Sequence, residues 1–397
     1  MLSQHVIFPF IYFINRWRRI DEYVVILADA HHDTCPPQMD ALKKRLIEGH
    51  YDVRECFKNL AQCSTFAGMC YMINFMKLYA MAGTVVICDN YLPVASCRKR
   101  KETRVIQLWH GCGAFKKFGY DATDDIPEMY MGNVYKNYSL VTVSGEYCIP
   151  YFESAMRINQ NKDSKEAGYV HDNANEYAGN IDLNNAISVN NVVRATGISY
   201  TDRFYDKAYI DTCRDRFRYE YPDAVGKKVI LWAPTFRGNA GTIIEESLKQ
   251  MGEEYVDRLS ENEDVYVIKS LHPHFMKGKK VSMTTGELLV CADVLITDYS
   301  SVFFEYLLMD RPIIFFASDY DKYSEERGYY LDYTGLPGVI VTDGDSLAQT
   351  VRTVIDCDTQ DMHKKREIFR ERYMSACDGN ATERIISYIK SSSGIEK

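Results

Sequence analysis

The chain has 397 residues, which is too long for one hydrophobic core of ordinary size and indicates two domains. Apolar residues make up 46% of the sequence and charged residues 26%, a balance typical of folded globular proteins and not of disordered or fibrous ones. The net charge of −8 argues against a general nucleic-acid-binding protein, because affinity for the phosphate backbone depends on clustered Lys and Arg.

The twelve cysteines include no CxxC pair, so the sequence predicts neither a zinc ribbon nor a disulfide framework, and reduced cytoplasmic thiols are the simpler interpretation. The apolar run 6–14 is shorter than the roughly 20 residues that span a bilayer and lacks a signal-peptide cleavage pattern. Because three arginines and a tryptophan follow it, residues 1–19 are a candidate membrane-surface segment. A helix packed on the domain is the open alternative.

In the first half of the chain, short apolar runs typical of strands alternate with segments of helix length. The expected strands are 23–28, 51–56, 84–89, 104–109, 140–144 and 192–196. Helices are expected over 36–48, 64–81 and 144–156. Residues 159–191 are rich in Asn, Asp, Ser and Gly with little periodicity, so we interpret them as an insertion or a long surface loop.

The second half repeats the alternation. Strands are expected over 228–232, 265–269, 293–297 and 312–316, and helices over 208–219, 302–309, 346–355, 361–374 and 381–390. The pattern predicts an α/β protein with two doubly wound parallel sheets facing each other across a cleft, the architecture called GT-B among glycosyltransferases. We place the N-terminal domain at 20–204 and the C-terminal domain at 205–397.

Polar side chains recur just beyond the predicted carboxyl ends of the strands, where open α/β sheets bind ligands. They are His110, Thr235, Arg237, His272, His274, Ser300 and Ser301. Ser300 and Ser301 precede a helix whose free N–H groups can hold a phosphate, and helix capping is the alternative. Arg237 and Thr235 offer a guanidinium and a hydroxyl to the same oxygens, which favours phosphate binding.

Other polar residues carry weaker signals. His272 and His274 suit proton transfer near neutral pH, and a zinc site is the weaker interpretation because no third ligand lies nearby in the sequence. We expect His31 and His32 to be loop histidines. Lys116 is either a solvated lysine or a group that attracts an anionic acceptor.

Five ordered motifs resemble the CDP-glycerol glycerophosphotransferase family, which includes the primases and polymerases of wall teichoic acid and related capsule enzymes. They are QLWHGCGAFKKFG (107–119), ILWAPTFRG (230–238), IKSLHPHF (268–275), ADVLITDYSSVFFEYLLMDRPIIFF (292–316) and CDGNATERI (377–385). The resemblance extends from about residue 20 to 390. It implies a GT-B fold, a CDP-activated polyol phosphate as donor and a membrane-associated acceptor at the cytoplasmic face.

The resemblance also implies roles for individual residues. His110 matches the histidine of the family's histidine-glycine motif and is the expected base, and His272 matches the first histidine of the HPH motif and is expected to stabilise or protonate phosphate. The donor-side candidates are Thr235, Arg237, His274, Ser300, Ser301, Glu305, Asp378 and Gly379, and the acceptor-side candidates are Gly111, Lys116 and Asp202. For Glu305, packing at the edge of the core is the alternative. Residues 112–115 depart from the family's common Thr-Pro-Leu.

The resulting hypothesis is an enzyme in which an acceptor hydroxyl attacks the β-phosphorus of CDP-glycerol or a related CDP-polyol and releases CMP. The acceptor would be lipid-linked or polymeric, and the enzyme would act peripherally at the inner face of the cell membrane. No cofactor or metal is expected, because Arg237 and a helix terminus can supply positive charge and no DxD-type motif is evident. A nucleotide-sugar glycosyltransferase of the same fold and a non-catalytic binding protein with the same cleft stay open as alternatives.

Overall fold

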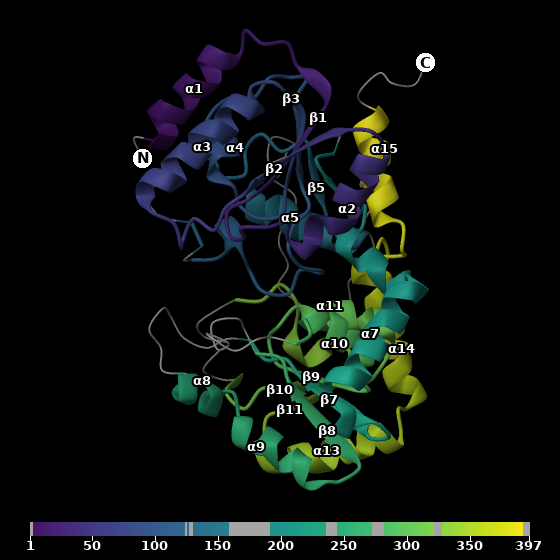
Figure 1. Cartoon of the computed structure of the whole chain (residues 1–397). Helices are drawn as coiled ribbons and strands as arrows, with labels where there is room; N and C mark the ends of the chain where they lie inside the picture. The colour runs from purple at the N-terminus through teal and green to yellow at the C-terminus, as the bar shows by residue number, and fades with distance from the viewer. Residues whose placement is uncertain are drawn as a thin grey trace.

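The protein folds into two α/β domains, which lie one above the other in Figure 1. The computed structural model describes residues 3–123, 125–126, 130–158, 191–235, 244–271, 282–320 and 328–391. Arg237, His272, His274 and all but the last residue of the predicted insertion 159–191 lie outside this part of the chain.

The first domain contains a six-stranded parallel sheet in the order β2-β1-β3-β4-β5-β6. Its strands are β1 (Asp21–Asp29), β2 (Asp52–Phe57), β3 (Ala82–Ile87), β4 (Arg104–Gln107), β5 (Leu140–Thr142) and β6 (Val193–Arg194). Every residue of β3 and β4 is buried, because helices cover both faces of the sheet. The predicted parallel sheet is therefore confirmed for this half of the chain.

Helices from both ends of the chain cover the first sheet (Figure 1). They are the π-helical turn Ser3–Ile7, α1 (Phe8–Asn15), α2 (Pro37–Glu48), α3 (Thr65–Tyr79), α4 (Leu92–Ala95), α5 (Ile149–Met156) and α15 (Ala381–Ser391). On one face, α2 and α15 place Leu42 and Ile386 in the same core as Val25 of β1. On the other face, Tyr12 of α1 packs against Tyr79 of α3, with ring centroids 5.0 Å apart.

The second domain contains a five-stranded parallel sheet in the order β11-β10-β9-β7-β8. Its strands are β7 (Lys228–Trp232), β8 (Val265–Lys269), β9 (Val294–Thr297), β10 (Ile313–Phe316) and β11 (Val339–Val341). The edge strand β11 is absent from the sequence prediction, because three apolar residues are too few to give a periodic signal. The other four strands confirm the second predicted sheet.

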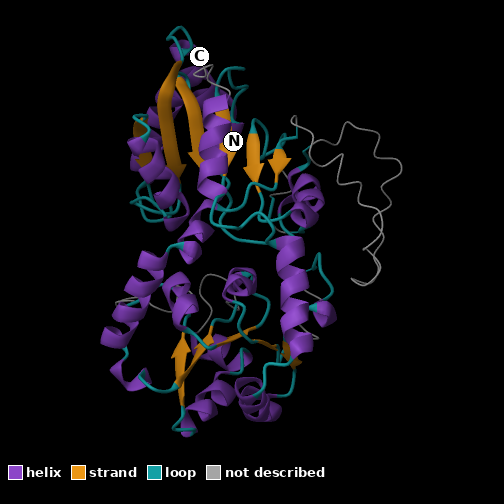
Figure 2. Ribbon diagram, turned by 90° about the vertical axis from the view of Figure 1, so that its right-hand side faces the viewer, coloured by secondary structure: helices purple, strands orange, loops and turns teal. Residues whose placement is uncertain are grey.

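Helices also flank the second sheet (Figure 1 and Figure 2). They are α7 (Lys207–Glu220), α8 (Ile244–Gln250), α9 (Glu253–Arg258), α10 (Thr285–Cys291), α11 (Val302–Tyr306), α13 (Leu347–Asp356) and α14 (Gln360–Tyr373). Val256 of α9 and Val351 of α13 pack on one face of the sheet beside Ile230, while Leu289 of α10 and Phe303 of α11 belong to the core on the other face.

The C-terminal helix α15 returns to the first domain, although it follows α14 of the second. Arg45 of α2 contacts Glu383 of α15 at 2.5 Å, and a guanidinium N–H of Arg104 donates to the carbonyl of Ile389. The predicted C-terminal domain, 205–397, thus includes a helix that packs on the first sheet. The chain crosses between the domains at residues 374–380, just before this helix.

The strand before His110 is shorter than predicted. We expected it to extend through Trp109, but β4 ends at Gln107. The backbone N–H of Trp109 donates to Oε1 of Gln107 at 2.9 Å, and Trp109 has a φ of 63°, a left-handed conformation that turns the chain out of the sheet. The predicted strand 84–89 ends early as well, at Ile87, so Asp89 lies in the loop after β3.

The loop after β4 approaches the second domain closely at Gly113. A Cβ atom on Gly113 would lie 2.2 Å from the ring of Phe304 in α11, and Gly113 has a φ of 68°. Gly226 has a φ of 82° but would have no atom within 4 Å of its Cβ. A side chain at either glycine would strain the backbone, but only one at Gly113 would also clash with the other domain. Comparing substitutions at the two positions therefore separates the two effects.

We predict that Gly113→Ala lowers the free energy of unfolding by about 2–4 kcal/mol, because a left-handed alanine and an overpacked contact add their costs. The matched control Gly226→Ala should lose only about 1 kcal/mol. Urea unfolding of both variants measures the difference. Equal losses would mean that the loop does not pack against α11 as described.

Candidate active site

The loop that carries His110 lies against the start of α11 in the other domain. A Cβ atom on Gly111 would lie 3.5 Å from Oγ of Ser301, which is ordinary van der Waals contact. Phe115 packs edge-on against Phe303, with centroids 5.6 Å apart. The structure therefore brings Gly111, the residue after His110 in the first domain, beside Ser301 of the second.

A short antiparallel pairing joins this loop to residues 328–330. Lys116 forms a β-bridge with Tyr329, Lys117 N–H donates to Gly328 at 3.0 Å, and Tyr330 N–H donates to Phe115 at 2.8 Å. Cys112, Ala114 and Phe115 are each less than 5% exposed. The residues that depart from the common family pattern are thus packed within the protein, and the backbone of Lys116 takes part in a bridge between the domains.

Asp298 organises the carboxyl ends of β7 and β9. Its buried carboxylate accepts from the backbone N–H of Thr235 at 2.7 Å and of Tyr299 at 2.5 Å. The hydroxyl of Ser300, two residues after Asp298, accepts from Val302 N–H at 3.4 Å, which is a weak cap for α11. Ser301 occupies the N-cap position but makes no side-chain capping bond there. The capping alternative therefore describes Ser300 and not Ser301.

The ring of His110 is held between an aromatic and a carboxylate. It stacks on Trp109, with ring centroids 4.6 Å apart and an interplanar angle of 26°. Trp109 in turn packs against Phe118 and Phe152, at centroid distances of 4.8 and 5.3 Å. Half of the His110 side-chain surface remains exposed. The imidazole is thus anchored on one side and open to an incoming molecule on the other.

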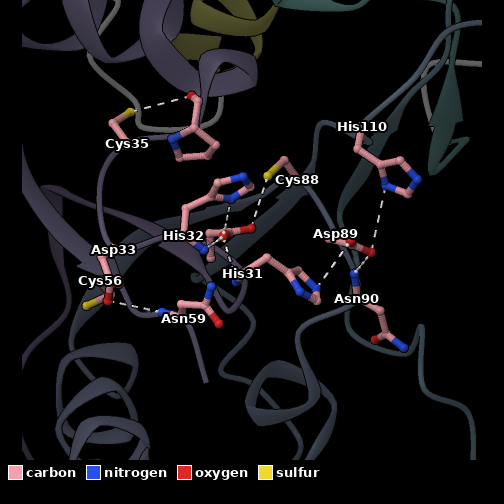
Figure 3. A network of polar contacts seen from close by, with 12 residues as sticks. His31, His32, Asp33, Cys35, Cys56, Asn59, Cys88, Asp89, Asn90 and His110 are labelled. Atoms are coloured by element: carbon pink, nitrogen blue, oxygen red, sulfur yellow. Dashed lines mark hydrogen bonds and ion pairs between the residues drawn. The ribbon is translucent and has the colours of Figure 1, made fainter. Parts of the chain in front are cut away.

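Two histidines share the carboxylate of Asp89, as Figure 3 shows. Nδ1 of His110 lies 3.7 Å from Oδ1 of Asp89, and Nε2 of His31 lies 3.4 Å from Oδ2. The three residues follow β4, β3 and β1, which are neighbours in the sheet. Sequence reasoning selected His110 by its place after a strand but did not select His31 or Asp89, although both carry the same positional signal.

His32, which lies beside His31 in Figure 3, forms a second carboxylate contact. Its Nδ1 lies 2.8 Å from Oδ2 of Asp29, which also accepts from the backbone N–H groups of His31 and His32 at 2.8 Å each. Burial opposes ionisation of Asp29, but these donors outweigh it and hold the pKa of Asp29 below its usual value. The loop after β1 is therefore tied to a buried carboxylate at its first residues.

Glu305 of α11 lies against residues from the first domain. The hydroxyl of Tyr200, in the 3-10 turn Ser199–Tyr205, donates to its carboxylate, and Tyr200 also lies 3.6 Å from the thiol of Cys112. Removal from water raises the pKa of Glu305 to about 7, although the Tyr200 hydroxyl and the charge of Arg203 oppose the shift. This contact agrees with the packing alternative, and the predicted nucleotide role of Glu305 stays a prediction.

Three predicted site residues lie together at the start of α15. The carboxylate of Asp202 accepts from Ala381 N–H at 3.0 Å and from Thr382 N–H at 2.8 Å, so it caps this helix. Asp378 pairs with Arg384; burial opposes its ionisation, but that guanidinium outweighs it and lowers the pKa of Asp378. Gly379, with a φ of 86°, lies in the turn between Asp378 and the start of α15. These contacts are structural, and binding roles for the three residues stay predictions.

Residues 10–172 and 162–391 match the family described as CDP-Glycerol:Poly(glycerophosphate) glycerophosphotransferase. The chain belongs to this family. It is 32% identical to the teichoic acid ribitol-phosphate primase of Bacillus spizizenii, over 80% of this chain and 77% of the primase. It is 28% identical to the teichoic acid glycerol-phosphate primase of Bacillus subtilis, over 77% of this chain and 73% of that one. The matched part spans 48% of the poly(ribitol-phosphate) polymerase of Bacillus spizizenii.

Solved structures place this family member among two-domain GT-B proteins. A structure of the wall teichoic acid polymerase TagF superposes with a TM-score of 0.71 at 19% identity, covering 98% of this chain and 92% of that one. A UDP-GlcNAc 2-epimerase from Methanocaldococcus jannaschii gives a TM-score of 0.52 at 13% identity, over 93% and 99%. The predicted GT-B fold is confirmed.

We predict that Glu305→Gln stabilises the protein at pH 8 by on the order of 2–3 kcal/mol, and that the gain shrinks as the pH falls below 7 and disappears only as the pH falls below the ordinary glutamate value of 4.5. Between its ordinary value and a pKa of about 7, the folded state binds the Glu305 proton more tightly than the unfolded state, so wild-type stability falls as pH rises through this window. Glutamine stays neutral and can still accept from Tyr200. Urea unfolding at several pH values measures the gap.

The control is Glu263→Gln, an exposed glutamate in the same domain. The difference in the free energy of unfolding between this variant and wild type should be the same at every pH. A Glu305→Gln effect that is constant from pH 5 to 8 would contradict the raised pKa.

Proposed function

We propose that this chain transfers glycerol phosphate, or a related polyol phosphate, from a CDP-activated donor to a hydroxyl of a lipid-linked or polymeric acceptor. The product is a teichoic acid or capsule-like polymer. Family membership and the similarity to ribitol-phosphate and glycerol-phosphate primases support this reaction class. The observation that carries the proposal is the approach of Gly111 to Ser301, because it sets the loop of a candidate base beside a candidate phosphate-binding residue.

In the proposed reaction, the acceptor oxygen attacks the β-phosphorus of the donor, a new P–O bond forms, and the bond from this phosphorus to the bridging oxygen breaks. CMP leaves with that oxygen. His110 takes the proton of the acceptor hydroxyl as general base. His272, which lies outside the described residues, stabilises the transferring phosphate or protonates the leaving one. Holding the reactants in line and neutralising charge supply the rest of the acceleration.

The proposed donor site collects groups from the carboxyl ends of the second sheet. Its members are Thr235, Arg237, His274, Ser300 and Ser301 around the diphosphate, with Glu305, Asp378 and Gly379 toward the nucleotide. The hydrogen bonds from Thr235 and Tyr299 to Asp298 support this grouping, because they join the loop that leads to Arg237 to the loop of the two serines. We propose that Arg237 and backbone N–H groups neutralise the diphosphate without a cofactor or a metal.

The proposed acceptor site lies on the first domain, at Gly111 and the side chain of Lys116. Lys116 offers a positive charge to an anionic polyol-phosphate chain. Asp202 is also proposed on the acceptor side. Both of its carboxylate oxygens accept from the start of α15, so they are occupied by capping. Contact with the acceptor is therefore expected mainly from the loop after β4.

The protein should release CMP from CDP-glycerol or CDP-ribitol when a lipid-linked polyol-phosphate acceptor is present. His110→Ala and His272→Ala should each lower this rate by roughly 10²- to 10⁴-fold, the usual contribution of a general acid–base group. Product mass on a defined acceptor, together with CMP release, measures the reaction.

The matched control is His363→Ala on α14, where the histidine pairs with Asp310 at 3.0 Å. This variant should keep the wild-type rate. Release of UDP from UDP-sugars, but never CMP, would contradict the proposal and favour the glycosyltransferase alternative, while binding of CDP-glycerol without turnover would favour a binding protein.

We also propose that α1 holds the protein on the inner face of the cell membrane. None of the helices in the described ranges has the length and apolarity to cross a bilayer. Phe8 and Tyr12 bury one side of α1, whereas Phe10 and Phe13 on its other side are 59% and 68% exposed, and Trp17 after it is 80% exposed. An exposed apolar helix face beside arginines is suited to an anionic lipid surface.

The triple variant Phe10→Ser, Phe13→Ser, Trp17→Ser should bind vesicles of anionic lipid at least about tenfold more weakly, because three apolar side chains no longer enter the interface. Vesicle co-sedimentation measures this. The control Tyr219→Ser removes an aromatic that is 83% exposed in the second domain and should leave binding unchanged. Equal binding of the triple variant and wild type would rule out α1 as the contact.

A further inference from the structure

We propose that Asp89 is the positioning residue of the base His110, and that His31 holds the same carboxylate from its other side. This inference rests on the proposed function, since it concerns how the base of that reaction is oriented. We refer to His110, Asp89 and His31 as the two-histidine array, which Figure 3 shows. It lies on three neighbouring loops of the first sheet and needs no residue of the second domain.

The side chain of Gln107 joins two of the loops that carry the array. Nε2 of Gln107 donates to the backbone carbonyl of Asp89 at 3.0 Å, and Oε1 accepts from Trp109 N–H at 2.9 Å. Gln107 is fully buried, so both bonds are shielded from water. One amide side chain therefore sets the separation between the loop of Asp89 and the loop of His110.

The carboxylate of Asp89 is also held by its own turn. Its Oδ1 accepts from the backbone N–H of Asn90 at 2.6 Å, which fixes the side chain close to the end of β3. The other oxygen, Oδ2, lies 3.4 Å from Nε2 of His31. The backbone of His31 is held in turn, because its N–H donates to the buried Asp29. Asp89 thus faces His110 from a defined position.

This position selects the tautomer that a base needs. Nδ1 of His110 faces Asp89, so a proton on Nδ1 is favoured and Nε2 is left with its lone pair on the far side of the ring. Stacking on Trp109 opposes rotation of the ring. The Nδ1 to Oδ1 distance of 3.7 Å is longer than a hydrogen bond, as is common for general acid–base groups before substrate binds.

The array also stabilises the positive charge that forms on His110 during the reaction. When the acceptor O–H bond breaks, the proton moves to Nε2 of His110, the oxygen keeps the electron pair for attack on phosphorus, and the imidazole becomes a cation. Asp89 then lies beside that positive charge and stabilises it. The proton then leaves Nε2 of His110 for solvent, because half of the His110 side chain is exposed. His31 contacts the other oxygen of Asp89 and so helps to keep the carboxylate in place.

Kinetics of CMP release test the assignment. Asp89→Asn should lower kcat by about 10- to 10²-fold, part of the full contribution of the base, with KM for CDP-glycerol changed less than about twofold. Asp89→Glu should recover part of the rate, and His31→Gln should lose only a few-fold. The limb on which activity rises with pH should move in Asp89→Asn, since the charge beside His110 is gone.

The control is Asp33→Asn in the loop after β1, where the carboxylate pairs with Lys58 at 2.6 Å and not with His110. It removes the same charge at the same edge of the sheet and should keep the wild-type rate and pH profile. A rate and pH profile of Asp89→Asn that match wild type would overturn the proposal. So would a loss of rate in Asp89→Asn with an unmoved pH profile and no rescue by Asp89→Glu.

A second measurement does not depend on catalysis. In protein with ¹⁵N-labelled histidine, the His110 resonances, assigned with His110→Gln, should report a proton on Nδ1 at high pH in wild type and a shift toward Nε2 in Asp89→Ala. Asp33→Ala should leave them unchanged. Wild-type protein without CMP release but with this tautomer shift would sink the proposed function and keep the array, whereas an unchanged tautomer would sink the array alone.

Discussion

The buried hydroxyl of Ser144 is the contact on which the arrangement of the two domains depends. It donates to the carbonyl of Tyr373 at 2.6 Å and accepts from Gly113 N–H at 2.8 Å, and the carbonyl of Ser144 accepts from Ala376 N–H at 3.0 Å. An unpaired buried N–H or C=O costs about 1–3 kcal/mol. Through its hydroxyl and its carbonyl, one residue just after β5 thus holds the His110 loop, the end of α14 and the crossing segment that leads to α15.

Much of the fold was predictable from the sequence because buried parallel strands are continuous apolar runs. The bounds of β7 and β8 agree with the prediction at both ends. Helix α10 was missed, although Thr284 and Glu287 form a capping box whose spacing is visible in the sequence. Its seven residues are too few for a helical period to stand out, so the capping box alone was not enough to predict the helix.

Residues of the candidate site were predictable only where their position after a predicted strand was enough to select them. His110 and Ser301 follow strands and were selected on that ground. Asp89 follows a strand too, but its relation to His110 arises because β3 and β4 are neighbours in the sheet, and strand order cannot be read from periodicity. Residues 112–115 are packed against the other domain, and a single sequence carries no signal for contacts between domains.

The return of α15 to the first domain means that two covalent segments join the domains side by side. The hydroxyl of Tyr205, at the first crossing, donates to the carbonyl of Cys377, at the second, at 2.7 Å. Two bonded segments restrict rotation of one domain against the other more than a single linker would. The bridge between Lys116 and Tyr329 is a third, non-covalent link between the domains, so the loop after β4 is held by the second domain as well as by the first sheet.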